Sequence, residues 1–272
     1  MQYLAKRFLS SCVKTSRYLG IGKKNSGSII LLYHSIGKED INDYLKLRIN
    51  PESFEEQMAC LYEKKYKVIP LSELINNLSN SNSMPLNTVS ITFDDGYLDN
   101  IDLAVPILKK YEFPATIFIT TDYLKGKRNR DNYWEKWEYL TTEKLEKLTS
   151  LGVEVGSHSS SHKVLTSLDN GRIRDEISCS KKILEDITQN KINLLSYPHG
   201  IFNEKVKKLL YENGYLAACT SVMGFNNERS DLYELKRIEI RSDDSLKDFK
   251  DKLEGYYNWL GYFQRRRYYK KA

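Results

Sequence analysis

TVSITFDDG, residues 88–96, reads as a β-strand that ends in two adjacent carboxylates and a glycine. Apolar side chains alternate with polar ones along its first six positions, and β-branched and aromatic residues favour extended backbone. Neighbouring strand residues point to opposite faces, so Asp94 and Asp95 can share a site only if the backbone turns there, which Gly96 permits. Two carboxylates this close need a cation or donors to compensate them. A strand followed by an ordinary Asp-Gly turn is the alternative.

Strand patterns and helix patterns alternate along most of the chain. Strands are predicted at residues 28–33, 66–70, 88–93, 115–120, 153–157, 194–197, 216–220 and 235–241. Helices are predicted at residues 3–19, 51–65, 71–78, 99–110, 142–151, 169–188, 203–213 and 245–260, and Pro106 is expected to kink the fourth of them or to begin a second helix. Such alternation is typical of a parallel sheet with helical crossovers, and seven or eight strands are enough for a barrel.

The positive charge of the chain lies at its two ends. The whole sequence has 272 residues and a net charge of +6, but residues 1–30 and 255–272 hold eleven basic residues and no acid, which leaves −5 between them. A nucleic-acid-binding domain carries its positive charge across a folded face, so we expect no nucleic-acid partner. Basic ends fit peripheral contact with an anionic membrane, and equally fit plain exposure to solvent.

The N-terminal segment does not read as a signal peptide. Its uncharged run between Arg7 and Lys14 is shorter than the roughly 7–15 residues of an h-region. No stretch approaches the roughly 20 apolar residues of a transmembrane helix. Residues 3–19 fit a basic amphipathic helix on a membrane, and equally a terminal helix docked on the protein. We expect a cytoplasmic location, or a peripheral one at the membrane.

The four cysteines are widely spaced, with no CxxC pair. This spacing does not indicate a zinc knuckle or a disulfide framework, and a reducing compartment is the simpler interpretation. Cys179 and Cys219 lie in segments with an apolar pattern, so both are expected to be buried thiols.

All four histidines follow predicted strands; they are His34, His158, His162 and His199. In a parallel barrel the C-terminal ends of the strands gather at one face, where active sites lie, so we expect these side chains to meet. HSSSH, residues 158–162, places two imidazoles four residues apart, within reach of one ion if the segment coils. Together with a carboxylate of residues 94–95, they form a set that suits zinc and leaves coordination positions open for water. Unrelated histidines in solvated loops are the alternative.

TFDDG and HSSSH resemble the first two motifs of the polysaccharide deacetylase family, the NodB-homology domain of carbohydrate esterase family 4. YPHG, residues 197–200, is similar to the third motif in its YPxG form, and the resemblance covers about residues 28–241. The pattern is nearest to the subgroup that acts on poly-N-acetylglucosamine. The resemblance implies a distorted (β/α) barrel of about seven strands. It also implies metal-dependent removal of an N-acetyl group from N-acetylhexosamine units of a polysaccharide or glycan precursor.

The family's metal ligands match Asp95, His158 and His162, and its general base matches Asp94. The resemblance therefore implies a divalent ion, with zinc preferred and cobalt or nickel as alternatives. It also implies a metal-bound water as the nucleophile, whose proton Asp94 accepts.

The third motif implies a substrate or oxyanion contact, and it matches Tyr197, Pro198 and His199. Here a backbone N–H near His199 could donate to the developing oxyanion. The family's usual base-orienting Arg is missing from this motif, and Arg237 is the candidate replacement.

Two further departures concern the proton donor. The family's fourth motif is not recognisable, and its C-terminal Leu-x-His is missing because no histidine follows His199. We therefore assign the general acid to His34, which resembles the early Tyr-His of the poly-N-acetylglucosamine subgroup. A hydrogen-bonded core histidine is the alternative.

We expect three parts in the chain: a basic N-terminal extension over 1–27, a deacetylase domain over 28–260, and a basic tail over 261–272. The expected partner is a carbohydrate with N-acetylated amino sugars. Tyr133, Trp134 and Trp137, in a predicted loop over 122–140, fit both stacking on sugar rings and packing against the protein. Two other functions stay open: a deacetylase or deformylase of a lipid-linked sugar at the membrane, and a catalytically inactive carbohydrate-binding homologue.

Overall fold

The computed structural model describes residues 2–19, 27–41, 43–80, 87–126 and 137–269. Its strands are β1 (Ile29–Tyr33), β2 (Ser35–Ile36), β3 (Arg48–Ile49), β4 (Lys67–Val68), β5 (Thr88–Phe93), β6 (Thr116–Ile119), β7 (Glu154–Ser157), β8 (Leu194–Ser196), β9 (Ala217–Cys219) and β10 (Ile238–Glu239). Its α-helices are α1 (Gln2–Tyr18), α2 (Pro51–Glu63), α3 (Leu71–Ser79), α4 (Val105–Lys110), α5 (Thr121–Leu124), α6 (Thr142–Ser150), α7 (Asn170–Thr188), α8 (Glu204–Glu212), α9 (Leu246–Leu253) and α10 (Leu260–Tyr268).

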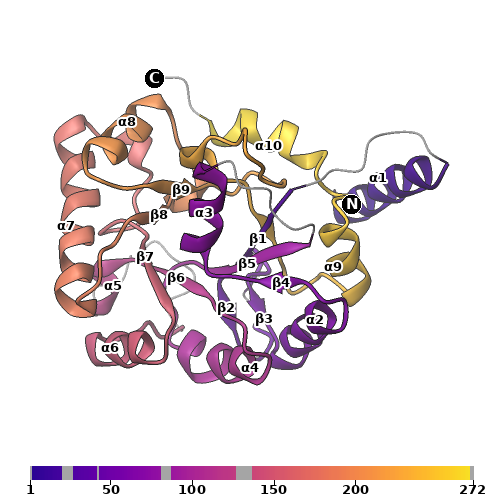
Figure 1. The fold of residues 1–272 in the computed structure, drawn as a ribbon, viewed down its shortest axis with the longest axis horizontal. Coiled ribbons are helices and arrows are strands. Elements are labelled where there is room, and N and C mark those ends of the chain that lie inside the picture. The colour runs from indigo at the N-terminus through magenta and orange to yellow at the C-terminus, as the bar shows by residue number, and fades with distance from the viewer. Residues whose placement is uncertain (1, 20–26, 42, 81–86, 127–136, 270–272) are drawn as a thin grey trace.

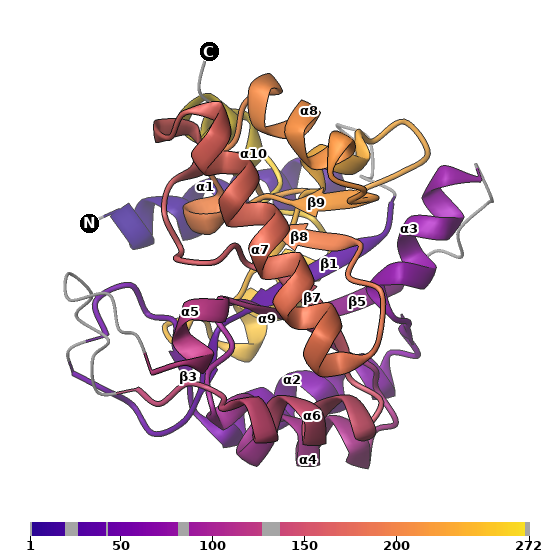
Figure 2. The same cartoon turned by 90° about the vertical axis from the view of Figure 1, so that its left-hand side faces the viewer.

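The strands form a curled parallel sheet in the order β10-β1-β5-β6-β7-β8-β9, with β4 pairing β5 beside this path. A parallel bridge between Cys219 and Leu235 joins the β9 edge to the chain that enters β10, which brings the sheet round toward its own start. Helices surround the sheet (Figure 1), and α7 packs on β7 (Figure 2). The expected distorted barrel of about seven strands is confirmed.

The register of β1 and β5 sets the level at which the chain leaves the sheet. Both strands are buried along their full length, as expected for central parallel strands. Tyr33 pairs with Phe93, and the N–H of Asp94 donates to the carbonyl of Tyr33 at 3.0 Å. His34 and Asp94 therefore follow their strands at the same end of the barrel.

The chain turns sharply just after β5. Asp95 has φ +74° and Gly96 has φ +76°, both in the left-handed region. A Cβ on Gly96 would lie 2.9 Å from Cδ1 of Ile119, so the position has neither the backbone freedom nor the room for a side chain. The predicted turn after the strand is confirmed.

Two predicted helices are each divided in the structure. The segment predicted at 99–110 is a π-helical turn (Asn100–Ala104) followed by α4, and Pro106 lies in the first turn of α4, where its missing N–H costs no helical hydrogen bond. The helix predicted at 245–260 is wrong as a single element. It is interrupted at Gly255, with φ +73°, and α10 continues from Leu260 into the segment expected as a tail.

The burial of the cysteines differs in part from expectation. Cys219 is buried as predicted, but Cys179 is exposed. The inward positions of α7 are Ile173, Ile177 and Leu184, and Cys179 lies off that stripe. Over the described residues no helix has the length and apolarity needed to cross a bilayer. The predicted division of the chain at residues 27 and 260 stays a prediction.

Candidate active site

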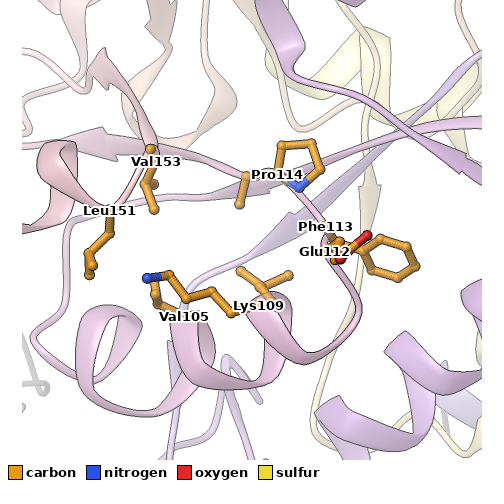
Figure 3. A pocket seen from close by; sticks show the side chains of 10 residues that line it. Val105, Lys109, Glu112, Phe113, Pro114, Leu151 and Val153 are labelled. Atoms are coloured by element: carbon orange, nitrogen blue, oxygen red, sulfur yellow. The ribbon is translucent and has the colours of Figure 1, made fainter.

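All four histidines line one cavity of about 510 Å³ at the C-terminal ends of the strands. Asp94 and Asp95 lie in the same cavity, together with residues from β10 and α10. A different pocket of about 370 Å³ lies where β6 and β7 begin, and Figure 3 shows its mainly apolar lining, including Val105, Leu151 and Val153. It contains no histidine, so the chemistry predicted from the sequence gathers in the first cavity.

In the described part of the chain, one group of side chains could hold a metal ion. It consists of Asp95, His158 and His162. The Nε2 atoms of His158 and His162 lie 3.4 and 3.3 Å from Oδ1 of Asp95. Two ligand atoms at about 2.0–2.1 Å from a tetrahedral ion are themselves about 3.3 Å apart, so this spacing fits a single ion. Burial opposes ionisation of Asp95, but hydrogen bonds with the two imidazoles hold its pKa well below the usual range.

The backbone around this group is fixed by specific contacts. Nδ1 of His158 donates to the carbonyl of Ser196 at 2.8 Å, which leaves the Nε2 lone pair free to face a ligand site. Glu176 of α7 accepts from the N–H groups of Ser160 and Ser161 at 3.0 and 2.8 Å. These bonds hold the short HSSSH loop in a coil, which is the condition under which both imidazoles can reach one ion.

Four residues at this site have left-handed backbone: Asp95, Ser159, His162 and His199, with φ between 59° and 74°. Non-glycine residues seldom adopt such angles, and strained positions of this kind concentrate at functional sites. Three of the four, Asp95, His162 and His199, line the cavity, while Ser159 is buried.

Asp94, the neighbour of Asp95 in sequence, is held by Arg237. Nη1 of Arg237 donates to Oδ1 of Asp94 at 2.8 Å, and Nη2 donates to Oδ2 at 2.7 Å, which is a bidentate ion pair. Arg237 is fully buried, and its Nε donates to the carbonyl of Thr220 at 2.8 Å. Burial raises the cost of ionising Asp94, but the charges of Arg237 and then His158 outweigh it, so its pKa lies below the ordinary value.

Ser196, at the end of β8, connects the two halves of the site. Its hydroxyl donates to Oδ2 of Asp94 at 2.9 Å and lies 2.8 Å from Nη2 of Arg237, while its carbonyl accepts from His158. The sequence analysis missed this residue. Its position at the C-terminal end of a barrel strand was the available signal, because such residues usually face the active site.

His34 lies on the cavity wall with one ring nitrogen unused. Its Nδ1 is buried and has no hydrogen-bond partner among the described residues, while Nδ2 of Asn100 donates to its backbone carbonyl at 2.7 Å. Buried polar atoms normally have a partner, so an unpaired one in a residue that lines the cavity is a candidate for contact with a bound molecule. The predicted core hydrogen bond, the alternative for His34, is not found on this nitrogen.

The third-motif residues contribute to the wall in different ways. The hydroxyl of Tyr197 donates to the carbonyl of Tyr233 at 3.0 Å, and its N–H donates to the carbonyl of Cys219. Pro198 has no N–H. The ring of His199 lies 4.5 Å from that of His162, and burial together with the charges of His162 and His158 lowers its pKa to about 4.

The aromatic residues predicted in the loop have mixed outcomes. Trp137 is buried, its Nε1 donates to Asp40 at 3.1 Å, and its ring meets that of Tyr97 edge-on at 5.3 Å. Packing is therefore the correct interpretation for Trp137. Tyr133 and Trp134 lie outside the described residues.

Several cavity residues had no signal in the sequence: Tyr97, Tyr123, Tyr139, Glu239, Arg241, Arg267 and Tyr268. The tyrosines form an aromatic wall, in which Tyr97 stacks on Tyr139 with ring centroids 4.9 Å apart. Arg267 and Tyr268 come from α10, in the segment expected to be a tail. Only the folded arrangement brings that distant segment to the cavity.

Comparison with known proteins agrees with this geometry. A family model described as Polysaccharide deacetylase matches residues 81–218, which is half of the chain. The Bacillus subtilis protein named "Putative polysaccharide deacetylase YxkH" is 30% identical over 211 residues, covering 78% of this chain and 70% of its own length. A Staphylococcus epidermidis protein named "Poly-beta-1,6-N-acetyl-D-glucosamine N-deacetylase" is 26% identical over 241 residues, covering 81% of each chain.

Solved structures show the same fold. The Streptococcus pyogenes deacetylase PplD, in complex with acetate, superposes with a TM-score of 0.74 at 24% identity, covering 84% of this chain and 98% of that one. IcaB from Ammonifex degensii superposes with a TM-score of 0.71 at 19% identity, covering 86% and 98%. The chain belongs to the polysaccharide deacetylase family, as its motifs indicated, and is therefore a hydrolase of the family's type.

Proposed function

We propose that the protein is a metal-dependent N-deacetylase of N-acetylhexosamine units in a polysaccharide or glycan precursor. The observation that carries this proposal is that one cavity holds both a possible metal-ligand group and a carboxylate suited to act as a base. Asp95, His158 and His162 form a ligand set, and Asp94 is ion-paired with Arg237 beside it. The poly-N-acetylglucosamine deacetylase named above supports an N-acetylated amino sugar as the substrate.

The donor set fits a divalent ion, and zinc best. Two imidazoles and one carboxylate are ligands that zinc accepts, and three protein ligands leave a position open, as catalytic zinc sites do. Cobalt and nickel accept the same donors. When bound, the ion would polarise the amide carbonyl and lower the pKa of a coordinated water.

Asp94 is the proposed general base. Its two oxygens already accept three hydrogen bonds from Arg237 and Ser196, which fix the orientation of the carboxylate. A carboxylate held in this way can accept a proton from the attacking water without rotating. Arg237 therefore supplies the orientation that the family's third-motif Arg usually supplies.

His34 is the proposed general acid. Departure of the amino sugar requires a proton on its nitrogen, and His34 lines the same cavity as Asp94 and Asp95. A proton on a ring nitrogen of His34 would be transferred to the leaving amine as the carbon–nitrogen bond breaks.

The oxyanion that develops on the amide carbonyl needs donors. Tyr197 commits its N–H to Cys219, and Pro198 has none, so His199 is the residue of this motif whose N–H we assign to the task. Its left-handed backbone, with φ +59°, distinguishes the position from an ordinary strand end.

The ion pair favours an active enzyme over an inactive homologue. That alternative rested on the missing Arg of the third motif and on the missing Leu-x-His, and the bidentate contact of Arg237 with Asp94 supports a replacement for the Arg. A lipid-linked sugar stays the alternative substrate, and a location in the cytoplasm or at the membrane surface stays a prediction.

Acetate release from N-acetylglucosamine oligomers tests the proposal. The zinc-loaded chain should release acetate, a chelator should stop the release, and added zinc should restore it. His162→Asn should lose zinc, as measured by elemental analysis. His199→Asn should keep it, because His199 is outside the ligand set; Asn suits the left-handed backbone of both positions. Acetate release that a chelator leaves unchanged, or zinc retained by His162→Asn, would refute the metal site.

A further inference from the structure

The N-terminal helix α1 contacts the protein through its polar side. Nε of Arg7 donates to Oδ1 of Asp248 at 2.9 Å, and Nζ of Lys14 lies 2.6 Å from Oδ1 of Asp251, both on α9. Between them Ser10 is buried, and its hydroxyl accepts from Nε1 of Trp259 at 3.2 Å. Figure 1 shows α1 beside α9 at one edge of the molecule.

The apolar side of α1 faces solvent. Phe8 is 70% exposed and Leu9 46%, and Leu19, which directly follows the helix, is 65% exposed. An amphipathic helix of a globular protein normally buries its apolar stripe, so this orientation is the reverse of the usual one. The sequence of α1 holds Lys and Arg but no Asp or Glu.

Helix α10, which follows directly on Trp259, carries a second exposed apolar surface beside α1. Tyr262 and Phe263 are 64% and 60% exposed, and their rings meet edge-on with centroids 5.5 Å apart. Phe263 also meets Trp259, the residue that contacts Ser10 of α1, at 6.2 Å. Arg266 lies over the ring of Tyr262 at 4.8 Å. One helical face therefore carries three aromatic rings and a cation next to α1.

We propose that these two exposed surfaces, together called the α1–α10 surface and formed by Phe8, Leu9, Trp259, Tyr262, Phe263 and Arg266, bind a bilayer that contains anionic lipid. Trp and Tyr prefer the boundary between headgroups and acyl chains, where one end of the ring is wet and the other dry. Phe and Leu add the apolar area that holds an interfacial helix in place. Lys6 and Arg266 would meet the negative headgroups.

Charge favours a bilayer over a second copy of the chain. Neither α1 nor α10 contains an acidic residue, so two copies that met through this surface would bring cations against cations. The carboxylates of α9 nearest to α1 are already paired with Arg7 and Lys14. With these pairs formed, Lys6 and Arg266 are cations that the surface still offers to anionic lipid.

Membrane contact would also bring the active-site cavity close to the bilayer surface. Arg267 and Tyr268, at the C-terminal end of α10, line the cavity that holds the histidines. A bilayer bound at Tyr262 and Phe263 would lie within two turns of that cavity wall. The proposal itself does not rest on the proposed function, since lipid binding is measured without substrate.

Co-sedimentation with vesicles tests the proposal on the full chain. The protein should sediment with vesicles of phosphatidylcholine mixed with phosphatidylglycerol, more weakly with phosphatidylcholine alone, and less as salt is added. Phe8→Ser and Phe263→Ser should each weaken binding to the mixed vesicles by about tenfold. Tyr211→Ser, which changes an equally exposed ring on α8, is the matched control and should bind as the unmodified chain does.

Circular dichroism melting of each variant would establish that it is folded. Equal vesicle binding by Phe263→Ser and Tyr211→Ser would overturn the proposal, as would no sedimentation with the mixed vesicles. A dimer in sedimentation equilibrium that Phe263→Ser dissociates, without lipid binding, would assign the surface to a second copy instead.

Discussion

Asp94 and Asp95 are neighbours in sequence with opposite surroundings. Asp95 turns toward two imidazoles, while Asp94 turns toward a buried guanidinium and a hydroxyl. The positive φ of Asp95 turns the backbone so that both carboxylates reach one cavity, because two consecutive strand residues would otherwise face opposite sides of the sheet. Asp94 is paired with Arg237, and hydrogen bonds with His158 and His162 hold the pKa of Asp95 low, so both carboxylates can stay ionised at short range.

Removal of the Arg237 guanidinium should destabilise the fold, because it leaves a buried charge on Asp94 without its partner. Arg237→Gln leaves Asp94 ionised and unpaired in the interior, and we expect the free energy of unfolding to fall by about 3–5 kcal/mol. The double variant Asp94→Asn with Arg237→Gln should recover part of this loss, because the uncompensated charge is gone. Urea denaturation in a double-mutant cycle measures the coupling, and strictly additive effects would contradict the ion pair.

Ser196 offers a way to test the proposed base separately from the proposed metal ligands. Ser196→Ala removes the hydroxyl that holds Asp94 and Arg237, but keeps the carbonyl that holds His158. We expect kcat to fall by about tenfold or more, with the zinc content unchanged. Steady-state kinetics beside elemental analysis checks this outcome. Loss of zinc, or an unchanged kcat, would show that the hydroxyl does not act through Asp94.

At the scale of elements, the π-helical turn after β5 positions His34. Asp99 accepts from the hydroxyl of Ser35 at 2.6 Å and from the N–H of Ile36 at 3.0 Å, which ties β2 to this turn. Asn100, the next residue, donates to the carbonyl of His34. Through these hydrogen bonds the π-helical turn fixes the position of the chain that leaves β1.

The carboxyl of Asp99 should make stability depend on pH. Burial, opposed by Ser35 and Ile36, raises its pKa to about 6. Between about pH 4 and 6 the unfolded chain has released this proton while the native state keeps it, so the free energy of unfolding falls as pH rises, by up to about 3 kcal/mol. Asp99→Asn should remove this part of the slope. Urea denaturation across the window checks it, and an identical slope in the variant would contradict the assignment.

Some elements could be predicted from sequence and others could not. The long helices and the central strands have periodic apolar patterns, and the two motifs fix the order of the metal-type residues. By contrast β2 and β3 are two residues each, too short for any period to appear. Cys179 was wrongly predicted to be buried because it lies next to the buried positions of α7 in sequence. In the helix it is exposed.

At the scale of the whole molecule, the barrel gathers distant residues at one end. Asp94 and Arg237 are 143 positions apart, and their contact follows because β10 pairs with β1, which pairs with β5. Parallel strands explain why four histidines scattered through the sequence meet, and this much could be predicted. The contribution of Arg267 and Tyr268 could not, because nothing in a basic C-terminal segment indicates that its helix closes over the cavity.

The rate of acetate release by zinc-loaded Asp94→Asn tests the central claim most directly. Asn keeps the size of the side chain and leaves the proposed ligands Asp95, His158 and His162 in place, but it cannot accept the proton of water. The account predicts that zinc content stays that of the unmodified chain while kcat on N-acetylglucosamine oligomers falls by about 10²–10⁴-fold. An Asp94→Asn variant that releases acetate as fast as the unmodified chain would contradict it.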